Sequence, residues 1–112
     1  MHEYSIAYDI YSTARRAALE NQAAQVTCVH VDFGAMAMVN PEQVKFLFDV
    51  IIEEDPLFTG ARLDCRDVET RSRCPCGYEG NERFVCPECG KLPEIVDGRE
   101  VVVTNIEIEV AD

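Results

Sequence analysis

Basic residues are scarce in this sequence. Ten Lys and Arg stand against 21 Asp and Glu, which gives the 112 residues a formal net charge of −11. An acidic surface of that size repels phosphate backbones and anionic lipids, so nucleic acids and membranes are poor candidate partners. Metal cations and basic protein surfaces are better ones.

Long apolar runs are absent as well. The longest, Ala35–Val39 and Val50–Ile52, fall far short of the roughly 20 residues that a membrane span needs. The N-terminus carries Glu3 and Asp9 and has no basic region followed by an apolar one, so we expect no signal peptide and a cytoplasmic protein. In that compartment the six cysteines indicate metal binding rather than a disulfide framework.

Histidine is limited to His2 and His30, which leaves little for acid–base catalysis. The sequence also has no legible nucleophile–base pair, no Gly-rich phosphate loop and no metal site with an open position. We therefore expect that the protein is not an enzyme. His30 alternates with Cys28 and Asp32 along a predicted strand, and we interpret it as a partly exposed histidine paired with a neighbour.

His2 follows directly on Met1, whose removal a bulky second residue should block. The α-amino group, the first backbone amides and the imidazole then lie within chelate distance of one another. Deprotonated nitrogens in a plane suit Ni(II) or Cu(II). The residue alone leaves a second interpretation open, that of a frayed terminal side chain without a ligand.

Two helices are predicted. No Pro or Gly occurs before residue 34, and apolar residues recur every fourth position from Ile6 to Ala18, which predicts a helix from Glu3 to about Gln22. A second helix begins after Asn40, an N-cap residue followed by Pro, and stops near Asp55-Pro56.

Three strands are predicted, at Gln25–Phe33, at about Ala61–Thr70 and at Glu100–Val110. The alternation of the last strand changes phase near Thr104-Asn105, which predicts a bulge there. The Asp97-Gly98 dipeptide just before it is typical of a type I′ turn, so we expect the residues on either side to pair as a hairpin.

The order helix, strand, helix, strand, cysteine-rich insert, strand predicts an α+β fold. We expect two helices on a small three-stranded sheet, with an inserted zinc-ribbon-like module of four cysteines. We assign residues 1–70 plus 98–112 to the α+β domain and residues 71–97 to the inserted module, which has too little aliphatic content for a core of its own.

The insert carries two cysteine pairs. Cys86 and Cys89, three residues apart and followed by Gly, form a zinc-knuckle sequence, and their partners are Cys74 and Cys76. Four thiolates make a closed tetrahedral site of the structural zinc type. The first pair is one residue shorter than the usual Cys-x-x-Cys, so a redox disulfide, a three-cysteine site and a rubredoxin-like iron site stay open as alternatives.

A series of motifs runs through the chain. They are Met1-His2-Glu3 with Ser5, Val31 to Gly34 followed by Asn40-Pro41-Glu42, the two cysteine pairs with Gly77-Tyr78-Glu79-Gly80, Asp97-Gly98-Arg99-Glu100, and Ile106-Glu107-Ile108-Glu109. In their order, spacing and total length they resemble the HypA family, the nickel-insertion accessory proteins of hydrogenase and sometimes urease. The resemblance covers essentially the whole chain.

This resemblance implies a nickel metallochaperone that delivers Ni(II) to the hydrogenase large-subunit precursor during [NiFe]-hydrogenase maturation. It implies nickel ligands at His2, Met1 and Glu3, within the domain of residues 1–70 plus 98–112. The donors would be the Met1 amine, the His2 amide and imidazole, and the Glu3 amide.

The resemblance also implies a structural Zn(II) at Cys74, Cys76, Cys86 and Cys89. The implied partners are a GTPase accessory protein of hydrogenase maturation and the large-subunit precursor. We expect a monomer or a weak homodimer. The alternative is a zinc-ribbon protein-interaction module without a nickel role, and a small redox protein is a further one.

Overall fold

The computed structural model describes residues 3–82 and 84–111. The elements follow the chain as α1 (Glu3–Glu20), β1 (Ala23–Gly34), the 3-10 turn η1 (Ala35–Ala37), α2 (Pro41–Ile52), the 3-10 turn η2 (Pro56–Phe58), β2 (Arg62–Val68), β3 (Arg71–Arg73), β4 (Glu79–Gly80), β5 (Glu94–Asp97) and β6 (Val101–Val110). Two helices and a small mixed sheet confirm the predicted α+β class.

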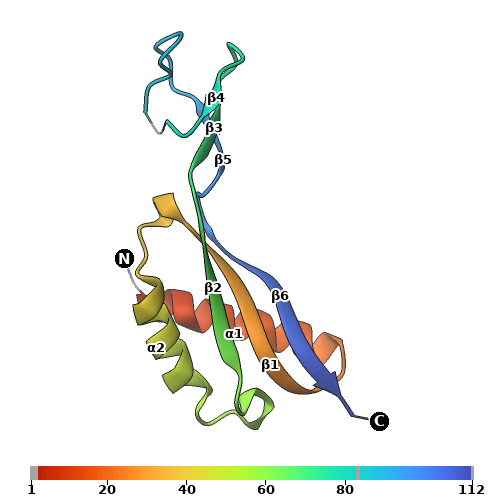
Figure 1. The fold of residues 1–112 in the computed structure, drawn as a ribbon. Coiled ribbons are helices and arrows are strands. Elements are labelled where there is room, and N and C mark those ends of the chain that lie inside the picture. The colour runs from red at the N-terminus through yellow and green to blue at the C-terminus, as the bar shows by residue number, and fades with distance from the viewer. Residues whose placement is uncertain (1–2, 83, 112) are drawn as a thin grey trace.

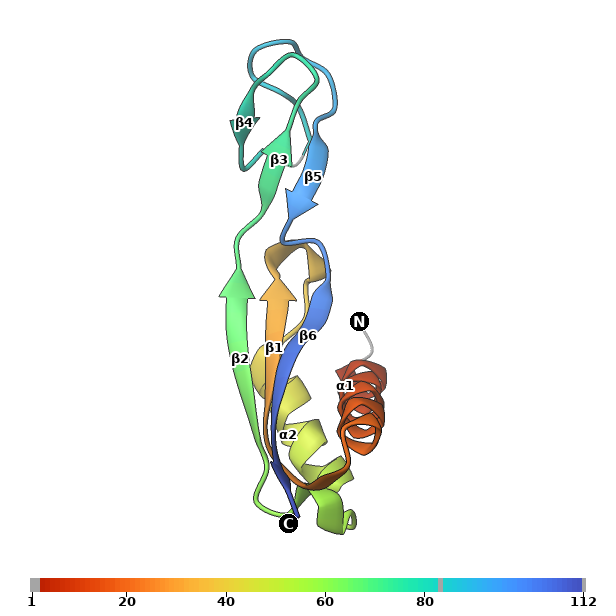
Figure 2. The ribbon, with the colours of Figure 1, turned by 90° about the vertical axis from the view of Figure 1, so that its right-hand side faces the viewer.

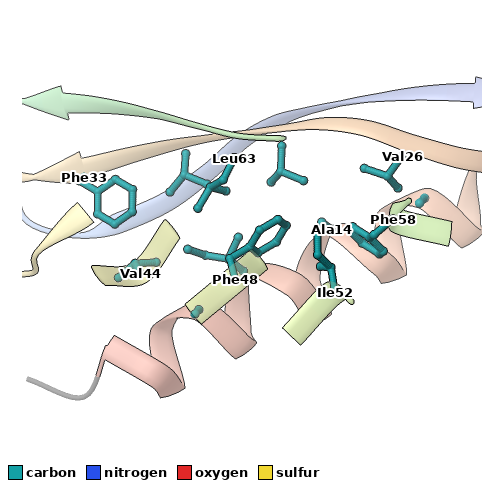
Figure 3. Close-up of a cluster of buried hydrophobic side chains, with 13 residues drawn as sticks. Ala14, Val26, Phe33, Val44, Phe48, Ile52, Phe58 and Leu63 are labelled. Carbon is teal, nitrogen blue, oxygen red and sulfur yellow. The ribbon is translucent and has the colours of Figure 1, made fainter. Parts of the chain in front are cut away.

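The larger sheet has the strand order β2-β1-β6. β1 runs parallel to β2 and antiparallel to β6, and α2 lies in the connection between the two parallel strands. Both helices lie on one face of this sheet, with the buried side chains between them and the strands (Figure 3). The other face is left open for polar residues.

The core of this part is a single apolar cluster. Its buried members are Ala7, Ile10, Ala14, Ala18, Val26, Val29, Val31, Phe33, Val44, Phe48, Ile52, Phe58 and Leu63. Of the predicted four-residue series, Ile10, Ala14 and Ala18 are buried and Ile6 is half-buried, and Ala7 is the fourth buried residue of α1. Three of its four buried residues are alanines, which let α1 approach the sheet closely.

The N-terminus of α2 is capped as predicted. The Asn40 side-chain oxygen accepts hydrogen bonds from the backbone amides of Glu42 and Gln43, at 3.0 and 3.3 Å. These amides have no partner inside the helix, so the cap satisfies two free donors of a first turn in which Pro41 has no N–H. The helix ends at Ile52, shortly before the predicted stop at Asp55-Pro56.

The predicted bulge in the last strand is confirmed. His30 pairs with Asn105 and Val31 with Val103, so Thr104 is the extra residue of β6. The predicted hairpin around Asp97-Gly98 is wrong. β5 pairs with β3 in a second sheet, whereas β6 pairs with β1 in the first, so the chain passes from one sheet to the other at this point.

The second sheet has the order β4-β3-β5 and lies beyond the end of the first (Figures 1 and 2). The resulting molecule is elongated, with extents of 57 × 28 × 16 Å. The connections are the segment between β2 and β3 and the segment between β5 and β6. This second sheet carries the four cysteines of the insert at its far end.

The passage between the sheets is tightly packed around Gly98. A Cβ atom at this position would lie 2.6 Å from the carbonyl oxygen of Glu69, and the φ of Gly98 is +82°. Its carbonyl oxygen accepts a hydrogen bond from the amide of Met36 at 2.8 Å. A Cβ at Gly34 would collide with the backbone of Gly98. The two segments that connect the sheets are thus packed against each other and against the end of β1.

Candidate metal centres

The four cysteines of the insert converge at one point. The sulfurs of Cys74 and Cys89 lie 3.3 Å apart and those of Cys76 and Cys86 lie 3.7 Å apart. All four lie within 4.8 Å of one another. A tetrahedral zinc ion with bonds of about 2.3 Å places its sulfurs about 3.8 Å apart, so this donor set fits a structural zinc site.

The second knuckle has a regular hydrogen-bond pattern. The amide of Gly90 donates to the Cys86 carbonyl at 2.9 Å, and the amide of Cys86 donates to the Lys91 carbonyl at 2.8 Å. These two bonds turn the chain back on itself, so that Cys86 and Cys89 reach the same point.

The shortened first knuckle closes in the same way. The amide of Gly77 donates to the Cys74 carbonyl at 2.9 Å, and the amide of Cys74 donates to the Tyr78 carbonyl at 2.8 Å. Each bond spans one residue fewer than its counterpart in the second knuckle. The first knuckle therefore closes with a turn that is one residue tighter than that of the second knuckle.

The thiols of this cluster differ in acidity. Burial works to raise the pKa of Cys86, but the backbone amides of Cys89 and Glu88 outweigh it and lower that pKa to about 7. At Cys74 the amide of Cys76 works to lower the pKa, whereas the Cys89 thiol and burial raise it to about 12. A divalent cation removes this inequality because it binds all four sulfurs as thiolates.

Of the predicted nickel ligands, Glu3 alone lies among the residues that the structure describes. Met1 and His2 fall outside the described residues. Glu3 is the first residue of α1 and is partly exposed. Figure 1 shows α1 running across the strands behind the larger sheet, away from the cysteine cluster. Glu3 and the four cysteines therefore lie on different parts of the fold.

The prediction for His30 is confirmed, because it is partly exposed and paired. Its Nε2 lies 2.6 Å from Glu107 and its Nδ1 lies 3.1 Å from Asp64. The hydrogen bond with His30 lowers the pKa of Glu107. Cys28 is buried, and burial raises the pKa of its thiol. Sequence reasoning missed that Glu107 joins Cys28 and His30, because the pairing of distant strands leaves no local signal.

The sequence profile described as "hydrogenase/urease nickel incorporation, metallochaperone, hypA" matches residues 1–108. The chain belongs to the HypA family. The hydrogenase maturation factor HypA of Methanocella arvoryzae is 39% identical over 98% of this chain and all of its own length. The factor of the same name from Methanothermobacter thermautotrophicus is 38% identical over the whole of both chains.

Solved HypA structures share the fold. The solution structure of the nickel metallochaperone HypA from Helicobacter pylori superposes with a TM-score of 0.79 at 25% identity, over 99% of this chain and all of that one. A second HypA solution structure gives a TM-score of 0.76 at 25% identity, over 96% of each chain. The predicted resemblance to HypA is thus confirmed by sequence and by fold.

Family membership also bears on the general role. HypA relatives are named as maturation factors and metallochaperones rather than for a catalysed reaction.

Within residues 3–82 and 84–111, neither helix is long and apolar enough to cross a membrane.

Proposed function

We propose that this chain binds Ni(II) through Met1, His2 and Glu3 and delivers it to the hydrogenase large-subunit precursor. The observation that carries the proposal is the family match, which begins at residue 1 and so includes this motif. Nickel incorporation is the role by which that family is described. Nickel is here a cargo that enters and leaves by ligand exchange.

The start of α1 suits this chemistry. The amide of Glu3 is among the first amides of the helix, which have no acceptor inside it, so deprotonating it for a metal breaks no helical hydrogen bond. The positive end of the helix dipole also favours negative charge on the nearby donors. The amine, amides and imidazole give up protons to the metal, so we expect nickel affinity to fall as the pH drops toward about 6.

We further propose that Cys74, Cys76, Cys86 and Cys89 hold a structural Zn(II). The nickel site would then belong to the domain of residues 1–70 plus 98–112, and the zinc site to the module of residues 71–97. The zinc would fix the far end of the molecule as a recognition surface. The conformity of the sulfur spacing with a tetrahedral ion supports this assignment.

The partners that this function requires are a GTPase accessory protein and the large-subunit precursor. The net charge of −11 supports contact with basic surfaces on these proteins, because opposite charge speeds their encounter. We propose that the chain acts in the cytoplasm as a monomer or weak homodimer.

The test is a calorimetric nickel titration of zinc-loaded protein with its native N-terminus. We expect one tight site at neutral pH, weakened toward pH 6, and lost in His2→Ala. A two-residue Gly-Ser extension before Met1 is a second test of the donor set, since it keeps His2 but removes the free amine at Met1. It should also abolish the site.

The alternative, a zinc-ribbon interaction module without a nickel role, predicts a different result. Equal nickel binding by the native protein and His2→Ala, or no binding by either, would favour that alternative. Nickel affinity that is unchanged between pH 7 and pH 6 would contradict the proposed donor set.

A further inference from the structure

The open face of the larger sheet carries a cluster that the proposed nickel and zinc sites do not use. Cys28 and His30 lie two residues apart on β1 and so share a face, while Val29 between them points into the core. Glu107 on β6 lies opposite Cys28, and Asp64 on β2 lies opposite His30. Three strands thus supply a thiol, an imidazole and two carboxylates.

The potential donor atoms are close enough to share one ion. A donor atom of Cys28, one of His30 and one of Glu107 all lie within 4.8 Å of one another. The Nε2 of His30 lies 2.6 Å from the Glu107 carboxylate, while its Nδ1 lies 3.1 Å from Asp64. The Nε2 atom of His30 therefore points toward Glu107, and the Nδ1 atom points toward Asp64.

The fold holds this cluster in place. Cys28, Val29 and His30 pair in unbroken register with β6 residues 107, 106 and 105. The register shifts on both sides of this short segment, at Thr27 of β1 and Thr104 of β6. Cys28 is 1% exposed, so its thiol is fixed rather than mobile on the surface.

We propose that Cys28, His30 and Glu107 form a second metal site, for one divalent late transition metal ion such as Zn(II), Co(II) or Ni(II). Thiolate and imidazole donors select these ions over Ca(II) and Mg(II), which prefer oxygen. Asp64 completes the site by accepting the Nδ1 proton of His30. A carboxylate in that place orients a metal-binding histidine and raises its basicity.

Three protein donors leave a fourth coordination position free. Structural zinc sites are closed by four protein ligands, whereas sites with three keep a place for water or an incoming ligand. His30 is partly exposed and Glu107 is exposed, so that position is accessible from solvent. An ion here would exchange more readily than one in the four-cysteine cluster. The site is independent of the proposed nickel site at residues 1–3.

The experiment is a Co(II) titration of His2→Ala protein whose four-cysteine site has first been filled with one zinc. The His2→Ala background removes the N-terminal site, so the outcome does not depend on the proposed nickel function. We expect one Co(II) per chain and a sulfur-to-cobalt charge-transfer band from Cys28. Added Zn(II) should displace the cobalt and remove the band.

Variants then assign the donors. Cys28→Ser should abolish the charge-transfer band, whereas Cys65→Ser, which changes the other cysteine outside the insert, should leave it unchanged. Asp64→Asn should weaken Co(II) binding about 10- to 100-fold without removing the band. His30→Gln provides a second test of the site if Cys28→Ser does not fold.

The contrary results are equally distinct. A titration without the band would overturn the proposal. So would a band that persists in Cys28→Ser or in folded His30→Gln, or one that appears only as zinc is released into a chelating dye, since the cobalt would then occupy the four-cysteine cluster.

Discussion

The two ends of this elongated molecule are each stabilised in a different way. All 13 buried core residues lie between Ala7 and Leu63, in the part where two helices cover a sheet. In the described residues of the cysteine-rich end, the buried apolar residues are Cys74, Cys86 and Pro93. Its larger apolar side chains, such as Phe84 and Leu92, are exposed.

This contrast shows two ways of stabilising a folded segment. The hydrophobic effect stabilises a fold in proportion to the apolar area that it buries, and the helix-covered sheet buries enough apolar area to be stable. A segment of about 30 residues has too little, so it needs a cross-link or a metal. The four convergent sulfurs provide that second way.

Removing zinc should give the largest effect and should affect only one end. Structural zinc contributes about 10–16 kcal/mol of apparent binding free energy in small zinc-dependent folds. We expect a chelator to abolish amide protection in β3, β4 and β5 while α1 and β1 keep theirs. Hydrogen exchange followed by mass spectrometry measures both ends in one sample. Equal loss of protection in both would mean that they form one cooperative unit.

Truncating the core should destabilise the other end. Phe48 of α2 is fully buried, and replacing a buried Phe with Ala costs about 3–5 kcal/mol. We expect Phe48→Ala to lower the urea midpoint of the helical signal by a corresponding amount. The matched control is Phe46→Ala on the same helix, where the side chain is 55% exposed and the change should stay within about 0.5 kcal/mol. Similar losses in both would contradict the assigned core.

The smallest expected effect is at the junction between the two ends. Gly98→Ala puts a Cβ 2.6 Å from the Glu69 carbonyl oxygen at a φ of +82°, so we expect a loss of about 1–3 kcal/mol. Gly60 is the control, because its φ is +76° but a Cβ there would meet nothing within 4 Å. Thermal unfolding of the two variants separates collision from backbone strain. If Gly60→Ala is as destabilising as Gly98→Ala, the close packing of the junction contributes nothing.

Local features of the sequence predicted much of this fold correctly. The four-residue spacing in α1, the Asn40 cap and the phase change at Thr104 each concern residues near one another in the chain. Helix periodicity, capping and strand alternation are local effects, so they are legible without the partner elements. The cysteine spacing likewise indicated zinc, and the order of motifs indicated the HypA family before the comparisons confirmed it.

Contacts between distant segments were decided only in the tertiary structure. The turn signal at Asp97-Gly98 predicted a hairpin, but β5 found its partner in β3. The sequence predicted only that His30 pairs with a neighbour, whereas strand pairing brings Glu107 to both His30 and Cys28. The register between strands far apart in the sequence, such as β1 and β6, depends on which faces become buried together, and no single stretch of sequence encodes that choice.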